Sequence, residues 1–284
     1  PLRGQRAPGD PAARRAANAP VLGITGSNGK STVTTLVWQM LLAGGRLARA
    51  GGNLGTPALD LLEGAVPDCY VLELSSFQLD LTAELAAEVA CVLNLSPDHL
   101  DRHGSVEAYA AAKARILRGA RHIVLNADDP AVAAMAGSAA NVCWFGTSAA
   151  QARYHLATRG GARWLCCGEE AVIAADELGT RGLHNELNAL AALAVTDCVG
   201  LPRAAQCAAL RAFTGLEHRC RLVATHRGVS WYDDSKGTNI GATLATYASI
   251  CKARGEPMVF PGSPVAWSGL NDITDARLVA RPIA

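Results

Sequence analysis

The stretch "VLGITGSNGKSTVTTLV", residues 21–37, decides the fold of this chain. Its opening residues form a short apolar run that predicts a buried parallel strand, and residues 31–42 predict a helix. Gly26 and Gly29 lie at the turn between the two, where the missing Cβ lets backbone N–H groups approach an anion at a helix N-terminus. The stretch therefore predicts a phosphate-binding loop in an α/β fold.

The residues after the turn distinguish this loop from an ordinary glycine-rich turn. Lys30 adds a mobile positive charge, and Ser31 adds a hydroxyl suited to Mg²⁺. The usual P-loop pattern has a glycine six positions before the lysine, where this chain has Ile24, so the motif is the shorter G-x-x-G-K-S-T. Because a structural turn requires neither the lysine nor the hydroxyls, we interpret the stretch as a nucleotide-binding loop.

The composition narrows the class of protein. The chain has 284 residues, 50% of them hydrophobic, and a net charge of +1. Because basic and acidic residues are interspersed, we expect small-molecule partners and no nucleic acid. No apolar run reaches the roughly 18–20 residues of a membrane span and no secretory signal opens the sequence, so we expect no membrane association and a cytoplasmic location. The nine scattered cysteines predict reduced core thiols rather than disulfides or zinc ligands.

The order of apolar runs and helical stretches predicts a mostly parallel sheet with helices on both faces. Runs and helices alternate from residue 20 as far as "HIVLNADD", which ends at Asp129. Residues 141–180 change to short runs separated by turns, which predicts an antiparallel appendage. Helices are expected over residues 184–201 and 202–213, and "GVSWYDDSKGTN" begins a new strand-and-loop unit with a helix near residues 242–250.

Charged residues follow the strands at the edge of the sheet where ligands bind. Glu73 ends a buried run, where it either holds Mg²⁺ or accepts backbone N–H bonds. Lys113 lies on a small-residue helix and, from the pattern alone, is a solvated surface lysine. The segment "LNLSPDHLDRHGS" offers either satisfied loop residues or a functional histidine oriented by a carboxylate, from Asp98, His99, Asp101 and His103.

Eight segments together resemble the Mur ligase family. They span roughly residues 20–250 in this order: "GSNGKST", "GGNLG", "LELSSFQL", "DHLDRHGSVEAYAAAK", "NADD", "HNELNALAA", "FTGLEHR" and "DDSKGTN". The resemblance implies an ATP-dependent amide ligase of peptidoglycan and cell wall synthesis. ATP would phosphorylate the terminal carboxylate of UDP-N-acetylmuramoyl-L-alanine, and the amine of D-glutamate would attack the acyl phosphate. Such chemistry brings anions together and therefore requires cations at the site.

The resemblance also implies a role for each matching residue. The implied ATP-binding residues are Gly26, Ser27, Asn28, Gly29, Lys30, Ser31, Thr32, Asn185, Asn188, Arg219, Asp234 and Lys236. The residues that match muramoyl-substrate contacts are Asn53, Ser75 and His99. Two Mg²⁺ ions are implied, with Lys113 carbamylated and so turned into a carboxylate-like ligand, and their ligands are Ser31, Glu73, His99 and Lys113. The implied catalytic residues are Lys30, Glu73, His99, Lys113 and Lys236.

The three domains of the family are matched unequally. We predict a mobile lead-in over residues 1–19, a P-loop-like central ATPase domain over 20–216 and a truncated, Rossmann-like C-terminal ligase domain over 217–284. No counterpart of the UDP-binding domain precedes the loop, and the D-glutamate-binding segments are not recognisable after "PMVF". We interpret this as a fragment, a disrupted reading frame or an incomplete gene, and expect poor solubility or self-association through an exposed sheet edge.

Three alternatives stay open. A non-catalytic nucleotide-binding fragment would keep the loop and turn nothing over. A folylpolyglutamate synthetase shares the loop and the amide-forming mechanism, although "LELSSFQL" argues against it. A P-loop kinase or GTPase ranks last, because Ile24 replaces the P-loop glycine and the chain has no N-K-x-D guanine motif.

Overall fold

A computed structural model describes this chain in two units, which we treat separately: Pro1–Thr214 and Gly215–Ala284. The described residues are 19–83, 85–139, 141–219, 221–226, 229–237, 239, 243 and 277–279. The predicted lead-in therefore lies outside the described residues apart from Ala19, and so does the helix expected near 242–250 apart from Thr243. Within the described part of the chain, no helix has both the length and the apolar character needed to cross a bilayer.

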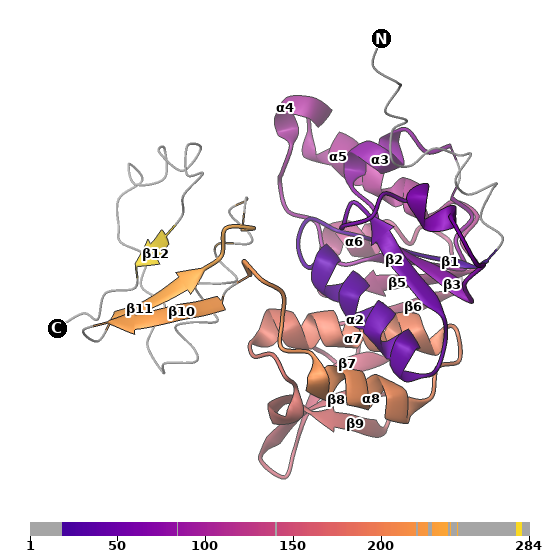
Figure 1. The fold of residues 1–284 in the computed structure, drawn as a ribbon. Coiled ribbons are helices and arrows are strands. Elements are labelled where there is room, and N and C mark those ends of the chain that lie inside the picture. The colour runs from indigo at the N-terminus through magenta and orange to yellow at the C-terminus, as the bar shows by residue number, and fades with distance from the viewer. Residues whose placement is uncertain are drawn as a thin grey trace. The chain divides into compact units, whose positions relative to one another are not determined.

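The first unit is built on a nine-stranded sheet with the order β2-β3-β1-β4-β5-β6-β7-β8-β9 (Figure 1). Neighbouring strands are parallel from β2 to β7, and β7, β8 and β9 are antiparallel. The strands are β1 Val21–Thr25, β2 Ala48–Gly52, β3 Cys69–Glu73, β4 Val89–Val92, β5 His122–Asn126, β6 Val142–Phe145, β7 Tyr154–Arg159, β8 Ala162–Cys167 and β9 Glu170–Ala174. The predicted α/β fold with a mostly parallel sheet is confirmed.

The expected antiparallel appendage over residues 141–180 is wrong at its start. Strand β6 pairs parallel with β5. The connection between these two strands contains a helix, α6 (Pro130–Ala134), and parallel neighbours need such a crossover. Strands β7 and β8 are joined by Gly160 and Gly161, both with positive φ, as a tight hairpin turn requires. The antiparallel strands thus extend the same sheet.

Helices cover both faces of this sheet, as the alternation of segments predicts. Strand β1 shows why its sequence is apolar throughout: Val21 packs into a core with Ile116 and Val132, whereas the neighbouring Leu22 faces the other side and is also fully buried. Helices α2 and α7 pack against each other and against the sheet. The helices are α2 Lys30–Ala43, α3 Ser76–Asp80, α4 Leu100–His103, α5 Val106–Ala114, α6, α7 Leu183–Asp197 and α8 Arg203–Ala212, with 3-10 turns η1 Asp60–Leu62, η2 Arg115–Leu117 and η3 Ala175–Glu177.

The second unit contains an antiparallel sheet with the order β10-β11-β12. Its strands are β10 Arg221–His226, β11 Val229–Asp233 and β12 Arg277–Val279. The strand expected in "GVSWYDD" is β11. The assignment of the two units to an ATPase domain and a ligase domain stays a prediction.

Candidate functional site

The phosphate loop connects β1 to α2 in a conformation that needs its glycines. Gly29 caps α2 with a positive φ of 80°, and a Cβ at this position would overlap Asn188 Oδ1. A Cβ at Gly26 would lie 2.9 Å from the Leu93 Cβ, which is closer than packing allows. Both positions therefore require glycine, and the predicted strand, turn and helix are confirmed, with α2 beginning at Lys30.

Two residues that the sequence did not single out hold the loop in place. Asn94, two residues after the end of β4, accepts a hydrogen bond from the Asn28 N–H (2.8 Å) and donates one to the Asn28 carbonyl (3.0 Å). The Tyr109 hydroxyl lies 3.1 Å from Ser27 Oγ, and burial raises the pKa of Tyr109 to about 12. The position of Asn94 just after a buried strand was an available signal, whereas nothing in the helical pattern marked Tyr109.

Lys30 lies over the loop. Its Nζ donates hydrogen bonds to the carbonyls of Gly26 (2.9 Å) and Ser27 (3.0 Å). Ser31 and Thr32 follow it in the first turn of α2, and both are buried. The lysine, the two hydroxyls and the helix N-terminus therefore lie together, as a nucleotide-phosphate site requires.

Lys113 also reaches this loop, so the surface position suggested by the sequence pattern is wrong. Its side chain is 1% exposed, its Nζ donates to the Gly26 carbonyl at 2.9 Å, and the same Nζ lies 4.6 Å from the centre of the Tyr109 ring. Burial and the nearby charge of Lys30 hold the pKa of Lys113 well below its usual range, although Asp98 and Glu73 act in the opposite direction. Burial therefore shifts the protonation equilibrium of this side chain toward the neutral amine.

Glu73 ends β3 beside β1, where it is in register with Ile24. The residue is 3% exposed, and its Oε1 accepts a hydrogen bond from Asn53 Nδ2 at 2.9 Å. Its Oε2 is buried and has no hydrogen-bond partner among the described residues. Because an unpaired buried carboxylate oxygen is costly, the position suits a cation. The arrangement supports the metal role over simple capping of the strand end.

Phe77 of α3 lies in a group of aromatic rings with two histidines at α4. The Phe77 ring centre is 4.8 Å from that of His99 and 5.5 Å from that of His103, with which it is stacked. His103 Nε2 also lies 3.0 Å from Ser76 Oγ, and burial lowers the pKa of His103. His99 has a positive φ of 53° and contacts Asp98 mainly through its backbone N–H, at 3.0 Å from Asp98 Oδ1.

The remaining candidates near the first unit's site differ in what they contact. Ser75 caps α3, and its Oγ accepts from the Gln78 N–H while the Ser75 N–H donates to Gln78 Oε1. Asp101 is exposed in the first turn of α4. Asn188 faces the phosphate loop at Gly29, as the clash with a Cβ shows. Asn185 is half-buried and donates a hydrogen bond to the Arg181 carbonyl at 2.8 Å, so the two asparagines contact different parts of the chain.

The other predicted ATP contacts belong to the second unit. Arg219 and Asp234 lie on either side of the β10–β11 hairpin, and the Lys236 N–H donates to the His218 carbonyl at 3.2 Å. His218 Nδ1 lies 2.7 Å from Asp233 Oδ2, which ties the same two segments together. These contacts bring Arg219 and Lys236 onto neighbouring segments of their own unit. A contribution to the site of the first unit stays a prediction.

No three His, Cys, Asp or Glu side chains come close enough to hold a metal ion within the part of the chain that the structure describes.

Comparison with known proteins gives a consistent result. Residues 24–196 match the Mur ligase middle domain. A UDP-N-acetylmuramoylalanine–D-glutamate ligase of Nitrosococcus oceani is 55% identical over 234 residues, which are 82% of this chain and 51% of that protein. The ligase of the same name from Pseudomonas savastanoi pv. phaseolicola is 51% identical over 238 residues, 83% of this chain and 53% of that protein. The chain thus spans about half the length of these relatives.

Solved structures agree at the level of the fold. A UDP-N-acetylmuramoyl-L-alanyl-D-glutamate–2,6-diaminopimelate ligase is 26% identical with a TM-score of 0.60, and the match covers 73% of this chain and 49% of that one. A MurF structure from Acinetobacter baumannii is 19% identical with a TM-score of 0.68, and the match covers 84% and 56%.

Proposed function

Since this chain belongs to the Mur ligase family, we propose that it binds Mg-ATP at the phosphate loop and adds D-glutamate to UDP-N-acetylmuramoyl-L-alanine. The observation that carries the proposal is Lys113, a buried lysine whose Nζ is hydrogen-bonded to the loop at Gly26. Folding alone gives no reason to bury a lysine beside a second lysine, because both charges oppose it. The two curated relatives above carry the name of this ligase, which supports the choice of substrates.

ATP binding would use the N-terminus of α2. Its backbone N–H groups point at the loop, and Lys30 Nζ, now on two carbonyl oxygens, would move to the β and γ phosphates. We assign the adenine contacts to Asn188 and Asn185 and further ATP contacts to Arg219, Asp234 and Lys236 of the second unit. The reaction consumes ATP and a nucleotide-linked sugar, and we therefore assign it to the cytoplasm.

We assign two Mg²⁺ ions to residues around the loop. Glu73, with its unpartnered Oε2, and Ser31 would hold the first, and His99 and Lys113 the second. When bound, the ions supply positive charge that offsets the charge on the transferring phosphate oxygens. The lowered pKa of Lys113 favours the neutral amine, which is the form that reacts with CO₂. The resulting carbamate would supply an oxygen ligand in place of a cation.

The chemical steps follow from these positions. The substrate carboxylate, positioned by Asn53, Ser75 and His99, would attack the γ phosphate to give an acyl phosphate and ADP. The amine of D-glutamate would then attack the acyl carbon and release phosphate. Lys30 would offset negative charge on the transferred group, which is where preorganised charge lowers the barrier most.

The experiment is product formation with the purified chain, Mg-ATP, both substrates and bicarbonate, followed by mass spectrometry. The proposal predicts UDP-N-acetylmuramoyl-L-alanyl-D-glutamate and one ADP for each product molecule. The matched variants are Lys113→Ala, expected to be inactive, and Arg118→Ala, expected to be fully active because Arg118 is exposed on the turn after η2. Mg-dependent ATP binding without product would reduce the function to nucleotide binding. Absence of both would overturn the proposal.

A further inference from the structure

The segment between β4 and α4 binds the phosphate loop at two of its residues. The Ser27 N–H donates a hydrogen bond to the Asn94 carbonyl at 2.9 Å. Ser27 Oγ accepts a hydrogen bond from the Ser96 N–H at 2.9 Å and donates one to the Ser96 carbonyl at 3.1 Å. The Asn94 side chain adds its two hydrogen bonds with the backbone of Asn28. Residues 94–96 thus hold the loop much as one strand holds its neighbour.

The side chain of Asn94 sets the direction of two peptide groups in the loop. Both peptide bonds are trans, so each is planar with its carbonyl and N–H pointing in opposite directions. The Asn28 carbonyl points at Asn94, so the Gly29 N–H in the same peptide group points away from it. The Asn28 N–H also points at Asn94, so the Ser27 carbonyl points away, and there it accepts the hydrogen bond from Lys30 Nζ. Asn94 therefore directs an N–H at the start of α2 and a carbonyl that holds Lys30.

Asp129 fixes the segment that carries Asn94. The residue caps α6 after β5, the strand that pairs with β4. Its Oδ2 accepts a hydrogen bond from the Leu95 N–H at 2.7 Å. Its Oδ1 accepts from the N–H groups of Ala131 (3.0 Å) and Val132 (3.2 Å) in the first turn of α6. Because the two carboxylate oxygens bind different segments, Asp129 ties the residue after Asn94 to the start of a helix through charge-assisted hydrogen bonds.

We propose that Asn94 and Asp129 are positioning residues of the nucleotide site: Asp129 holds residues 94–96, and Asn94 orients the phosphate loop for Mg-ATP. The inference rests on the proposed function, because it requires that the loop binds ATP. Both residues act through the backbone of the loop rather than through a contact with the nucleotide. The peptide groups around Asn28 are oriented before ATP arrives, so binding does not have to order them. Loss of either side chain frees these peptide groups and weakens Mg-ATP binding.

The experiment measures Mg-ATP affinity by calorimetry and folding by thermal unfolding in wild type, Asn94→Ala, Asp129→Ser and the double variant. Serine is a good N-cap, so Asp129→Ser keeps the cap of α6, but its single oxygen cannot also bind the Leu95 N–H. We expect the Kd for Mg-ATP to rise about tenfold in Asn94→Ala and about threefold or more in Asp129→Ser. Because Asp129 acts through Asn94, the Kd of the double variant should stay within about twofold of that of Asn94→Ala.

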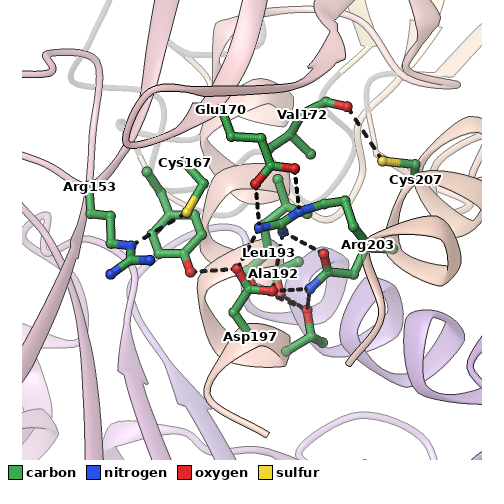
Figure 2. A network of polar contacts seen from close by, with 12 residues as sticks. Arg153, Cys167, Glu170, Val172, Ala192, Leu193, Asp197, Arg203 and Cys207 are labelled. Carbon is green, nitrogen blue, oxygen red and sulfur yellow. Dashed lines mark hydrogen bonds and ion pairs between the residues drawn. The ribbon is translucent and has the colours of Figure 1, made fainter. Parts of the chain in front are cut away.

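The control variant loses a hydrogen bond to a different carboxylate of the first unit. At the C-terminal end of α7, the Asp197 carboxylate accepts hydrogen bonds from the Tyr154 hydroxyl (2.6 Å) and the Arg203 guanidinium (2.9 Å) (Figure 2). This end lies about 13 Å along the helix from Asn188, which faces the loop. Tyr154→Phe should therefore lower the melting temperature but leave the Kd for Mg-ATP within about twofold of wild type. A rise in Kd equal to that of Asn94→Ala would overturn the proposal, because general destabilisation would then explain both.

The remaining outcomes separate this inference from the proposed function. Wild-type affinity in folded Asn94→Ala and Asp129→Ser would overturn the positioning roles and leave the proposed function standing. Effects of the two substitutions that multiply in the double variant would refute the action of Asp129 through Asn94. If Asn94→Ala does not fold, the comparison of Asp129→Ser with Tyr154→Phe decides, and equal affinities of these two variants would overturn the proposal. Absence of Mg-ATP binding by the wild type would overturn this inference and the proposed function together.

Discussion

The buried amine of Lys113 should make the stability of the first unit depend on pH. The pKa of Lys113 is well below its usual range in the folded chain, whereas an unfolded lysine titrates at about 10.4. Between these two pKa values the unfolded state binds the extra proton, so stability is lowest below the folded pKa and rises with pH across the window. A single proton corresponds to a slope of up to about 1.4 kcal/mol per pH unit. Lys113→Met removes this group while keeping an unbranched side chain of similar size.

The assay is urea unfolding of wild type and Lys113→Met from neutral to alkaline pH, in buffer free of Mg²⁺ and CO₂. The difference between the two curves isolates Lys113 from the other titrating groups. We expect the wild type to gain up to about 1.4 kcal/mol per pH unit relative to the variant, and the variant to be as stable as wild type or more so at neutral pH. Arg118→Met, at an exposed position, should keep the wild-type slope. Parallel curves for wild type and Lys113→Met would refute the argument that burial lowers the pKa of this amine.

Three further predictions concern single contacts. Glu73→Gln keeps the hydrogen bond with Asn53 but removes the negative charge. Calorimetry should therefore show Mg-ATP affinity reduced by about tenfold or more, while the affinity for ATP without metal stays within about twofold of wild type. Equal losses of the two affinities would contradict the metal role. Gly29→Ala should lower the free energy of unfolding in urea by about 1–3 kcal/mol, because φ is positive and the new Cβ would meet Asn188. Gly160→Ala should cost less, because φ is also positive there but nothing lies within 4 Å of the new Cβ. The reverse order would contradict the packing argument. Arg163→Met should lower the free energy of unfolding by about 3 kcal/mol, because it leaves the buried Glu186 carboxylate without its ion-pair partner. Adding Glu186→Leu should recover most of this loss. A double variant no more stable than Arg163→Met would contradict the cost assigned to the unpaired carboxylate.

The sequence predicts the fold best where the local pattern of residues directly reflects the packing, as in β1 and the turn after it. The run at β1 is apolar because both faces are covered, and its turn needs glycine because Asn188 leaves no room at Gly29. The parallel pairing of β6 was not predictable from its length alone. It depends on the crossover through α6, a helix of only five residues.

The residues that pack against the phosphate loop were harder to predict from the sequence than the loop itself. Lys113 and Tyr109 lie four residues apart on one face of α5, and only the packing of that face against the phosphate loop buries them. A helix of small residues gives the same periodicity whether it faces a ligand or solvent. The position of Lys113 therefore came from the resemblance, and the contact with Ser27 that places Tyr109 is visible in the structure alone.

The central claim is that the loop after β1 is a nucleotide-phosphate site, and equilibrium binding of Mg-ATP to wild type, Lys30→Ala and Arg118→Ala tests it most directly. Lys30 donates hydrogen bonds to two loop carbonyls and lies near the buried Lys113 amine, whose positive charge opposes its own, so its replacement should leave the melting temperature nearly unchanged. We predict that Lys30→Ala abolishes Mg-ATP binding and that Arg118→Ala retains it. Unchanged binding by a folded Lys30→Ala variant would contradict the account.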